Sequence, residues 1–208
     1  MTLTKGGIAV FIIGVAIAVI VVLKLIQVAG SSGVTVDSVA ARTQGPEQAK
    51  VKIVEFIDFE CPACAFGAQK LKEYVTHNPD DLRLEIKYYP LLNAHHHALQ
   101  VASYVECISR QGRFWPFFDA LMPVQSQWSQ LVNAEGIFGQ LALGAGADMK
   151  KLKSCLSSDN VSTTIMNEKS VGRSLGVQST PTYFVNKKMV VGTKSLIEEL
   201  NNYFPKSK

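Results

Sequence analysis

Two cysteines separated by two residues, Cys61 and Cys64, are the residues whose type and spacing most directly indicate chemistry. Pro62 between them suits the first position of a helix, because proline has no amide hydrogen to leave unpaired. Cys61 would then stand at the helix N-terminus, where free backbone N–H groups and the helix dipole favour a thiolate. Cys64 falls on one helical face with Ala68 and Leu71 and should point inward. One reachable and one sheltered sulfur is the arrangement that thiol–disulfide exchange needs.

Half of a zinc site, or an inert structural disulfide, is the alternative interpretation of this pair. A zinc site requires a second pair of ligands, and the remaining cysteines, Cys107 and Cys155, are isolated in the sequence. The three consecutive histidines at 95–97 are interpreted as the polar start of a helix near Ala98 rather than as metal ligands. We therefore expect neither a metal site nor a cofactor.

A proline far from the cysteines in the sequence is a candidate for the same site. Pro181 lies between Thr180 and Thr182, just ahead of a predicted strand. Proline is tolerated only at the start or the edge of a strand. The residue is either a cis-proline beside the cysteine pair or an ordinary turn proline, and its own sequence context leaves both open.

A carboxylate precedes the cysteines on the strand that leads to them. Glu55 lies six residues before Cys61 and shares a strand face with apolar Val51 and Ile53. A buried carboxyl there would have a raised pKa and could accept a proton beneath Cys64. If the strand is less buried than its composition indicates, Glu55 is instead solvated.

The elements that must position these residues follow from the hydrophobic periodicity. Residues 51–59 are apolar at nearly every position and predict a strand that is covered on both faces. The expected order continues with a helix to about residue 78, a strand at 82–89, helices at about 95–110, 114–122, 134–143, 149–156 and 161–175, strands at 182–186 and 189–191, and a helix at 195–203. This order predicts an α/β sandwich with an all-helical insertion.

The N-terminal segment has the character of a membrane span. Residues 6–23 are uncharged and almost wholly apolar, and as a helix they would reach roughly 27 Å. We interpret residues 1–30 as an anchor that contacts the lipid bilayer through residues 6–30, with a cleavable signal peptide as the alternative. Residues 31–50 are polar and predict a linker ahead of a domain at 51–208.

The composition excludes several classes of protein. Of the 208 residues, 47% are hydrophobic and 18% are charged, as in a folded protein, and the net charge of +4 is scattered along the chain. No stretch concentrates lysine and arginine with aromatic residues, so we expect no nucleic-acid partner. Four cysteines are too few for a disulfide scaffold of this length, so the core must be hydrophobic.

Two segments, VEFIDFECPAC at 54–64 and GVQSTPTYFVN at 176–186, resemble the DsbA-like branch of the thioredoxin superfamily. The resemblance covers the chain from about residue 45 to its C-terminus. It implies a thioredoxin fold with an inserted all-helical domain at about 95–158, which an N-terminal transmembrane helix would precede in this chain.

The resemblance also implies catalytic roles. Cys61 would be the nucleophile that links to the substrate, and Cys64 would be the resolving cysteine. Pro181 would be cis and would pack near both sulfurs. Glu55 matches the family's buried acid.

Substrate binding and a second disulfide are implied in the same way. Thr180 would offer backbone hydrogen bonds to an extended peptide, with Pro62 and Ala63 on the same surface. Some members of the family carry a second bridge, and we expect one between Cys107 and Cys155. Two buried free thiols are the alternative.

One departure from the family pattern concerns the residue before the second cysteine. The best-known oxidases of the family carry histidine there, and this chain has Ala63. The charge of an imidazolium is missing, and Glu60 beside Cys61 opposes ionisation. We therefore predict a Cys61 pKa below that of free cysteine but less depressed than in the histidine-bearing relatives.

These observations predict a protein-disulfide oxidoreductase that is tethered to the cell membrane by a single pass. Its catalytic domain would face the extracytoplasmic side, because an exchanging cysteine pair implies an oxidising compartment. As a monomer, it would introduce disulfides into reduced exported proteins, and a membrane re-oxidase of the DsbB or vitamin K epoxide reductase-like type would recycle it. The alternatives are a disulfide reductase or isomerase of the same fold and a non-catalytic tethered binding or chaperone module.

Overall fold

Strand β2 (Val51–Ile57) lies at the centre of a mixed sheet. It pairs parallel with β3 (Leu82–Tyr88) and antiparallel with β4 (Thr182–Val185). The strand order is β1-β3-β2-β4-β5, with β1 (Thr43–Gln44) and β5 (Lys188–Val191) as antiparallel edge strands. One face of β2 is buried along its whole length, but on the other face Lys52 is exposed and Val54 is half-buried, so the prediction of a strand covered on both faces holds only toward its C-terminal end.

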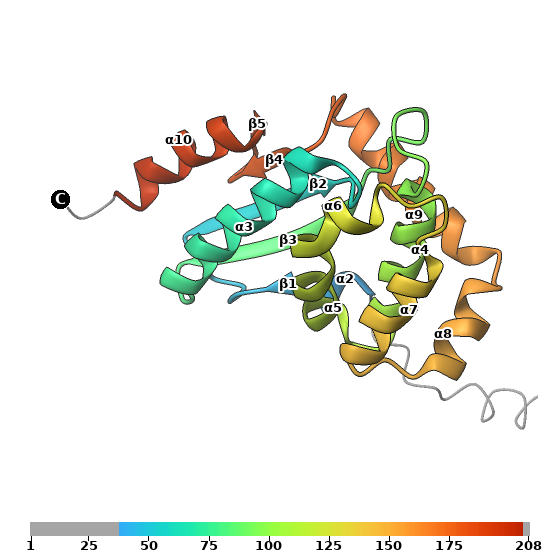
Figure 1. The fold of residues 1–208 in the computed structure, drawn as a ribbon. Helices are drawn as coiled ribbons and strands as arrows, with labels where there is room; N and C mark the ends of the chain where they lie inside the picture. The colour runs from blue at the N-terminus through green and yellow to red at the C-terminus, as the bar shows by residue number, and fades with distance from the viewer. Residues whose placement is uncertain (1–37, 206–208) are drawn as a thin grey trace, which may run out of the picture. The chain divides into compact units, whose positions relative to one another are not determined.

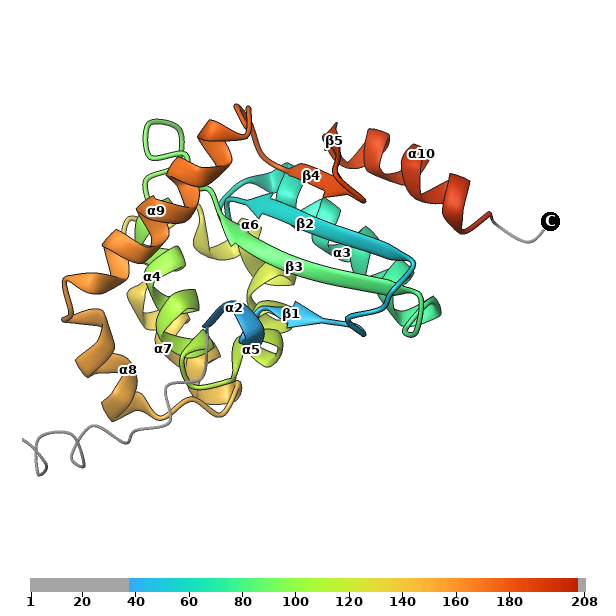
Figure 2. The ribbon, with the colours of Figure 1, turned by 180° about the vertical axis from the view of Figure 1, so that it is seen from behind.

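Helices including α3, α5 and α6 lie in front of this sheet in Figure 1, whereas β2 and β3 face the viewer in Figure 2, seen from behind. The structure, a computed structural model, describes residues 38–205. The helices in chain order are α2 (Ser38–Ala41), α3 (Pro62–His77), α4 (Ala98–Ser109), α5 (Phe114–Leu121), the 3-10 turn η1 (Met122–Val124), α6 (Gln125–Trp128), α7 (Glu135–Gly144), α8 (Met149–Leu156), α9 (Asn160–Ser174) and α10 (Thr193–Tyr203). Helices α4 to α8 occupy the segment at 95–158 that was predicted as a helical insertion.

The two faces of the sheet have different partners. Val51, Ile53 and Ile57 of β2 join the main apolar core, together with buried side chains of α3 and α10. The opposite face of β2 carries Phe56, which belongs to a second, smaller cluster. Gly172 of α9 packs there so closely that a β-carbon would lie 2.8 Å from the Phe56 ring. The alternation along β2 therefore directs one set of side chains toward α3, the helix of the cysteine pair.

The first described residues differ from the predicted linker at 31–50, because residues 38–44 form α2 and β1. Arg42 in this segment is fully buried and donates to both carboxylate oxygens of Glu168 on α9, over 3.0 and 2.7 Å. It also donates to the Ile86 carbonyl oxygen over 2.6 Å and stacks 4.1 Å from the centre of the Tyr88 ring. These partners are distant in the sequence, so no local pattern indicates them.

The predicted membrane segment at 1–30 lies outside the described residues. Between residues 38 and 205, no helix is long and apolar enough to cross a membrane. The anchor, its contact with a bilayer through residues 6–30 and the single-pass topology therefore stay predictions.

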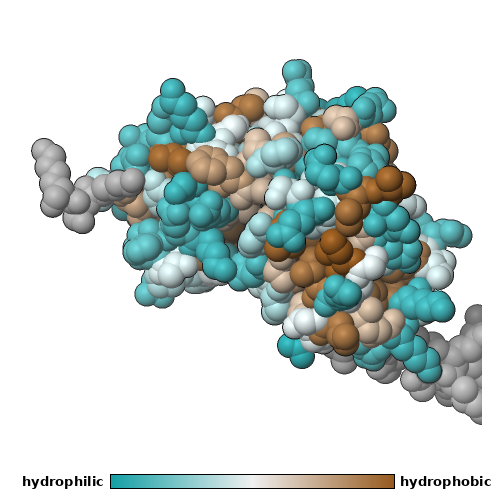
Figure 3. Space-filling view, in the orientation of Figure 1, coloured by the Kyte–Doolittle hydropathy of each residue, from teal (hydrophilic) through white to brown (hydrophobic). Residues whose placement is uncertain are grey.

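Apolar side chains are also exposed on the surface of the helical insertion, as Figure 3 shows. The large apolar residues exposed in this region include Leu131, Val132, Leu143 and Met149. Val132 has 99% of its surface exposed, in the loop between α6 and α7. Exposed apolar side chains of this kind favour contact with other proteins.

Candidate active site

Cys61 and Cys64 stand at the start of α3. Cys61 is the residue immediately before the helix, and Pro62 holds its first position. The Cys61 amide donates to the Asp58 carbonyl oxygen over 3.1 Å, which closes the turn between β2 and α3. Both cysteines are free thiols; Cys61 keeps 8% of its surface exposed and Cys64 keeps none. Both cysteines are therefore buried, and Cys61 is the more exposed of the two, in the predicted order but by a small margin.

The two sulfurs also differ in their tendency to ionise. A hydrogen bond from the Cys64 thiol lowers the pKa of Cys61 from 9.0 to about 5 and outweighs the opposing effect of burial. The Thr180 side chain and the backbone N–H groups of Cys64 and Ala63 lower this pKa further. Burial and then the interaction with Cys61 raise the pKa of Cys64 well above its ordinary value. These shifts favour a thiolate at Cys61 and a thiol at Cys64 near neutral pH; the predicted lowering of the Cys61 pKa is confirmed, and its comparison with the histidine-bearing relatives stays a prediction.

The peptide bond between Thr180 and Pro181 is cis, as the resemblance implied. The Cys61 thiol lies 3.6 Å from the Thr180 carbonyl oxygen and donates to it, so this loop stands directly against the nucleophile. The Thr180 hydroxyl is buried and has no hydrogen-bond partner among the described residues. It is therefore free to donate to the thiolate form of Cys61.

Glu55 is fully buried on β2, on the face that is covered by α3. Burial raises its pKa to about 8; the nearby Tyr183 hydroxyl opposes this rise, and the charge of Cys61 adds to it. Neither carboxyl oxygen has a partner at ordinary hydrogen-bond distance among the described residues. A carboxyl with a pKa near neutrality can both hold and release a proton, and its negative charge contributes to the raised pKa of Cys64.

A hollow of about 120 Å³ adjoins this carboxyl. Its wall includes Glu55 and Trp115, and the Trp115 indole N–H is also buried without a partner. Lys72 and Asp119 line it too, and these two residues form an exposed ion pair over 2.9 Å. A hollow of this size with unpaired polar groups on its wall has room for water.

The helical insertion supplies a residue of the site that the sequence reasoning missed. Gln125, the first residue of α6, is buried and donates to the carbonyl oxygens of Phe59 and Cys61 over 2.7 and 2.9 Å. It thereby holds the turn that carries the nucleophile. A glutamine in a short helix has no distinctive spacing, so the sequence offers no signal for this role.

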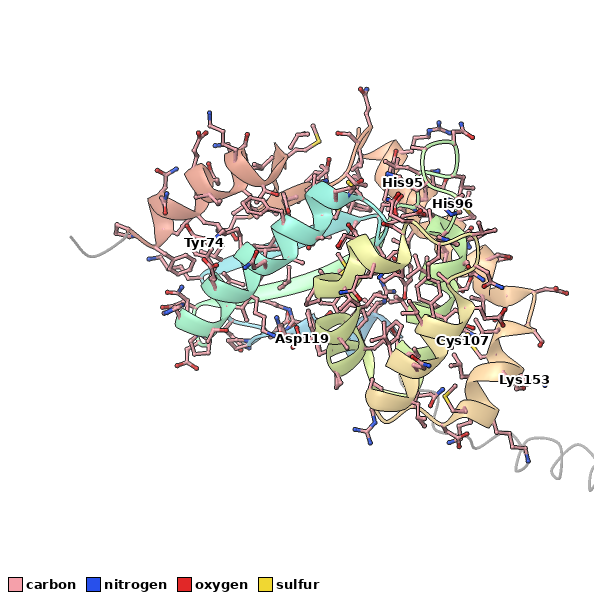
Figure 4. All side chains as sticks on the ribbon, viewed as in Figure 1. Tyr74, His95, His96, Cys107, Asp119 and Lys153 are labelled. Carbon is pink, nitrogen blue, oxygen red and sulfur yellow. A yellow bond between two sulfur atoms is a disulfide. The ribbon has the colours of Figure 1, made fainter. Side chains whose placement is uncertain are left out.

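Two buried carboxylates lie beside the cysteines: Glu60, which was expected to oppose ionisation of Cys61, and Asp58, which the sequence reasoning missed. Asp58 accepts hydrogen bonds from the Glu60 amide over 2.8 Å and from the His95 ring over 2.8 Å. Glu60 accepts from the His97 amide over 2.6 Å. Figure 4 shows His95 and His96 on the loop between β3 and α4, at the end of the molecule where α3 begins. The sequence did contain a signal for these contacts: acidic residues stand next to the cysteine pair, and a run of histidines occurs at 95–97.

The other two cysteines form a disulfide, as expected. Cys107 on α4 and Cys155 on α8 are joined by an S–S bond of 2.02 Å. This bond connects two helices of the insertion; Figure 4 labels Cys107 and, on α8, Lys153. The interpretation of these cysteines as two buried free thiols is wrong.

The residues between the reactive cysteines face solvent. Pro62 and Ala63 are both exposed. No group of three or more histidine, cysteine, aspartate or glutamate side chains between residues 38 and 205 could hold a metal ion.

A sequence family described as thioredoxin matches residues 37–203, which is more than half of the chain. The chain belongs to this family. Solved structures with the same fold include a thioredoxin-like oxidoreductase from Silicibacter pomeroyi, with 22% identity, 79% of this chain and 92% of that chain covered, and a TM-score of 0.63. BdbD from Bacillus subtilis, in its oxidised form, has 20% identity, coverages of 77% and 91%, and a TM-score of 0.66.

Another structure of this fold is alpha-DsbA1 from Wolbachia pipientis, with 20% identity, coverages of 77% and 87%, and a TM-score of 0.64. The predicted thioredoxin fold and membership of the thioredoxin superfamily are therefore confirmed, and the narrower DsbA-like branch stays a prediction.

Relatives in sequence are much longer proteins. The Na(+)/H(+) antiporter NhaA of Herminiimonas arsenicoxydans is 29% identical over 158 residues, which are 76% of this chain and 24% of that protein. The chain thus spans about a quarter of the length of the relatives that it matches in sequence.

Proposed function

We propose that this protein is a membrane-tethered, extracytoplasmic thiol:disulfide oxidoreductase that introduces disulfides into reduced exported proteins. The observation that carries the proposal is the opposite ionisation of the two sulfurs beside the cis peptide of Pro181. The pKa of Cys61 is about 5, and that of Cys64 is well above its ordinary value. A pair that is stabilised in the form of thiolate and thiol favours the reduced enzyme, and therefore favours transfer of the disulfide to a substrate.

The proposed reaction starts from the enzyme with a Cys61–Cys64 disulfide. A substrate thiolate attacks the Cys61 sulfur, the Cys61–Cys64 bond breaks, and Cys64 leaves as a thiolate that takes up a proton. A second substrate thiolate then attacks the substrate sulfur of the mixed disulfide and expels the Cys61 thiolate. The substrate is oxidised by two electrons, and the enzyme is left as a dithiol.

Glu55 is proposed to supply the proton for Cys64. Because its pKa is about 8, the carboxyl is mostly protonated at neutral pH and can donate to the departing Cys64 thiolate. In the reverse half of the cycle, the Glu55 carboxylate accepts the proton when Cys64 attacks to restore the disulfide. The hollow beside Glu55 and Trp115 gives water a place from which to exchange this proton.

Proteins, rather than small thiols, are the proposed substrates. An extended segment would lie against Thr180, Pro62 and Ala63, which border the Cys61 sulfur. Phe66, one turn further along α3, is 52% exposed and provides an apolar contact at the same end of the helix. An unfolded protein presents the extended backbone and the apolar side chains that such a surface would bind.

The membrane context of the proposal rests on residues 1–30. An anchor through residues 6–30 would hold the domain at the membrane, where a re-oxidase of the DsbB or vitamin K epoxide reductase-like type could reach the reduced enzyme. The domain limits proposed with it are an anchor at 1–30 and a catalytic domain with a helical insertion at 95–158. We propose that the protein acts as a monomer.

One experiment separates the proposed oxidase from the alternatives. The full chain, oxidised at Cys61–Cys64, is mixed with a reduced, unfolded disulfide protein, and the couple is equilibrated with glutathione. We expect disulfides to form in the substrate and a potential above about −200 mV. A potential near about −270 mV, together with rapid reduction of insulin, would instead favour a reductase. No exchange in either assay would leave only a binding or chaperone module.

A further inference from the structure

The cysteine turn contains two buried carboxylates. Asp58 keeps 1% of its surface exposed and Glu60 keeps 5%, and they lie three positions and one position before Cys61. Like charges near a thiolate disfavour it, most strongly where water is excluded. The low pKa of Cys61, about 5, exists in spite of these neighbours. A positive charge close to the turn would offset part of this repulsion.

The histidine run on the loop between β3 and α4 meets both carboxylates. The His95 ring nitrogen Nδ1 lies 2.8 Å from Asp58 Oδ2, and His96 Nδ1 lies 3.4 Å from Glu60 Oε1. His97 is engaged differently, since its Nε2 binds the Leu131 carbonyl oxygen over 2.8 Å. Figure 4 shows the labelled His95 and His96 together at this end of the molecule.

His95 is the better held of the two rings that face the carboxylates. Its side chain is 20% exposed, against 60% for His96. Asp58 is in turn fixed by the Leu91 amide, which donates to the same carboxylate oxygen over 2.7 Å. The His95 amide donates to the Leu91 carbonyl oxygen over 2.9 Å, so backbone and ring are both anchored.

The charged groups around His95 come from three elements. Asp58, Glu60 and Cys61 lie on the turn between β2 and α3, and His96 is the neighbour on its own loop. From α9, the Lys169 ammonium donates to the Pro90 carbonyl oxygen over 2.6 Å, at the start of that loop. Burial lowers the pKa of His95, but the Asp58 carboxylate, followed by the charges of Cys61 and Glu60, raises it above its ordinary value overall.

We propose that the imidazolium of His95, held by the buried Asp58 carboxylate, is a positioning charge that stabilises the Cys61 thiolate, in place of the histidine that this chain lacks at position 63. The inference deepens the proposed function, because it assigns part of the oxidising strength of the Cys61–Cys64 couple to a residue outside the cysteine dipeptide. His95 reaches the turn from the loop after β3.

The expected effect of His95 on the Cys61 pKa is smaller than that of the groups that form hydrogen bonds with the Cys61 sulfur. The Cys64 thiol has the largest influence in lowering the Cys61 pKa, and backbone N–H groups at the start of α3 also contribute. The charge of a partly exposed histidine adds a smaller increment, roughly half a pKa unit to one unit. That increment corresponds to an equilibrium shift of about three- to ten-fold.

The variant His95→Gln tests the proposal, because a glutamine amide can still donate to Asp58 but carries no charge. The thiolate of Cys61 is titrated by its ultraviolet absorbance, and the couple is equilibrated with glutathione. We expect a higher Cys61 pKa and a three- to ten-fold shift of the equilibrium toward the oxidised enzyme. His95→Lys, which keeps a cation, should recover at least part of both shifts.

Two histidine substitutions are matched controls. His77→Gln, at the far end of α3, should change neither quantity, and the exposed His96→Gln should shift them less than His95→Gln. The proposal is overturned if His95→Gln behaves like His77→Gln, or if it lowers the melting temperature and leaves the Cys61 titration unchanged. Neither readout requires oxidase activity, so failure of the proposed function in the substrate assay would be a separate result.

Discussion

The molecule holds two pairs of cysteines in two different states, and the comparison shows what makes a sulfur reactive. Cys61, immediately before α3, and Cys64, in its first turn, are three positions apart and are free thiols. Cys107 and Cys155 lie on two helices, 48 positions apart, and form a disulfide. The first pair stands at a helix N-terminus, against the cis peptide of Pro181, whereas the second connects packed helices. The position of each sulfur in the fold, rather than its residue type, assigns one pair to exchange and the other to stability.

The largest effect is expected when one of the two reactive cysteines is replaced. Cys61→Ser should abolish turnover, because no other sulfur stands at a helix start beside the cis peptide. Cys64→Ser should retain attack but trap mixed disulfides, which non-reducing gels of the reaction with substrate would show. A Cys61→Ser variant that oxidises substrate as fast as the wild type would contradict the assignment of roles.

Removal of the second pair should affect stability and leave the chemistry intact. With Cys107→Ala and Cys155→Ala together, the loss of a 48-residue closed loop should lower the free energy of unfolding by about 4 kcal/mol in the chain-entropy model. Denaturant unfolding measures this change. The rate of substrate oxidation at a temperature where the variant is folded is the control, and a large fall in that rate would show that the two pairs are coupled.

Glu55 extends the comparison, because the reactive pair has near it a buried carboxyl whose pKa is raised to about 8. The folded state raises the pKa of Glu55 from 4.5 to about 8. The unfolded chain therefore loses this proton first, and stability that is full below about pH 4.5 falls as the pH rises through about 8.

Glu55→Gln should remove this decrease in the free energy of unfolding, which amounts to a few kcal/mol between about pH 4.5 and pH 8. It should also slow turnover about ten-fold near neutral pH, because the proton for Cys64 is lost. Unfolding and rate profiles against pH measure both effects. Glu73→Gln, on the exposed face of α3, is the matched control and should follow the wild type in both profiles.

The smallest expected effect concerns the dipeptide between the reactive cysteines. Ala63→His adds a cation at an exposed position beside the Cys61 thiolate and should lower the Cys61 pKa by about one unit or less. Titration of the thiolate at low and high salt measures this change, which should shrink as salt is added. An increase in the Cys61 pKa would show that position 63 acts by geometry rather than by charge.

Much of this site was predictable because its chemistry depends on local spacing. The Cys61–Cys64 motif, the strand phase of Glu55 and the proline ahead of β4 are each visible within about ten residues of sequence. The central strands and most helices were predicted for the same reason, since periodicity reports which face is buried.

The rest depends on contacts between segments that are far apart in the chain. Gln125 reaches the cysteine turn from the insertion, and Asp58 meets His95 across 37 positions. The histidine run was interpreted as a polar helix start, since its buried acidic partners become visible only in three dimensions. In the same way, Arg42 lies in a segment of polar composition whose partner Glu168 is 126 positions away.

The buried ion pair between Arg42 and Glu168 limits how far the domain can be truncated from its N-terminal side. A fragment that starts at Val51, the boundary that composition indicates, would lose Arg42 and β1 together. The Glu168 carboxylate would then lose the cation that binds both of its oxygens and keep only Lys87, at 3.7 Å, and the free edge of β3 would be open to pairing with another molecule. Such a fragment should aggregate, whereas one that retains the chain from Ser38 onward keeps both the counter-charge and the protective edge strand.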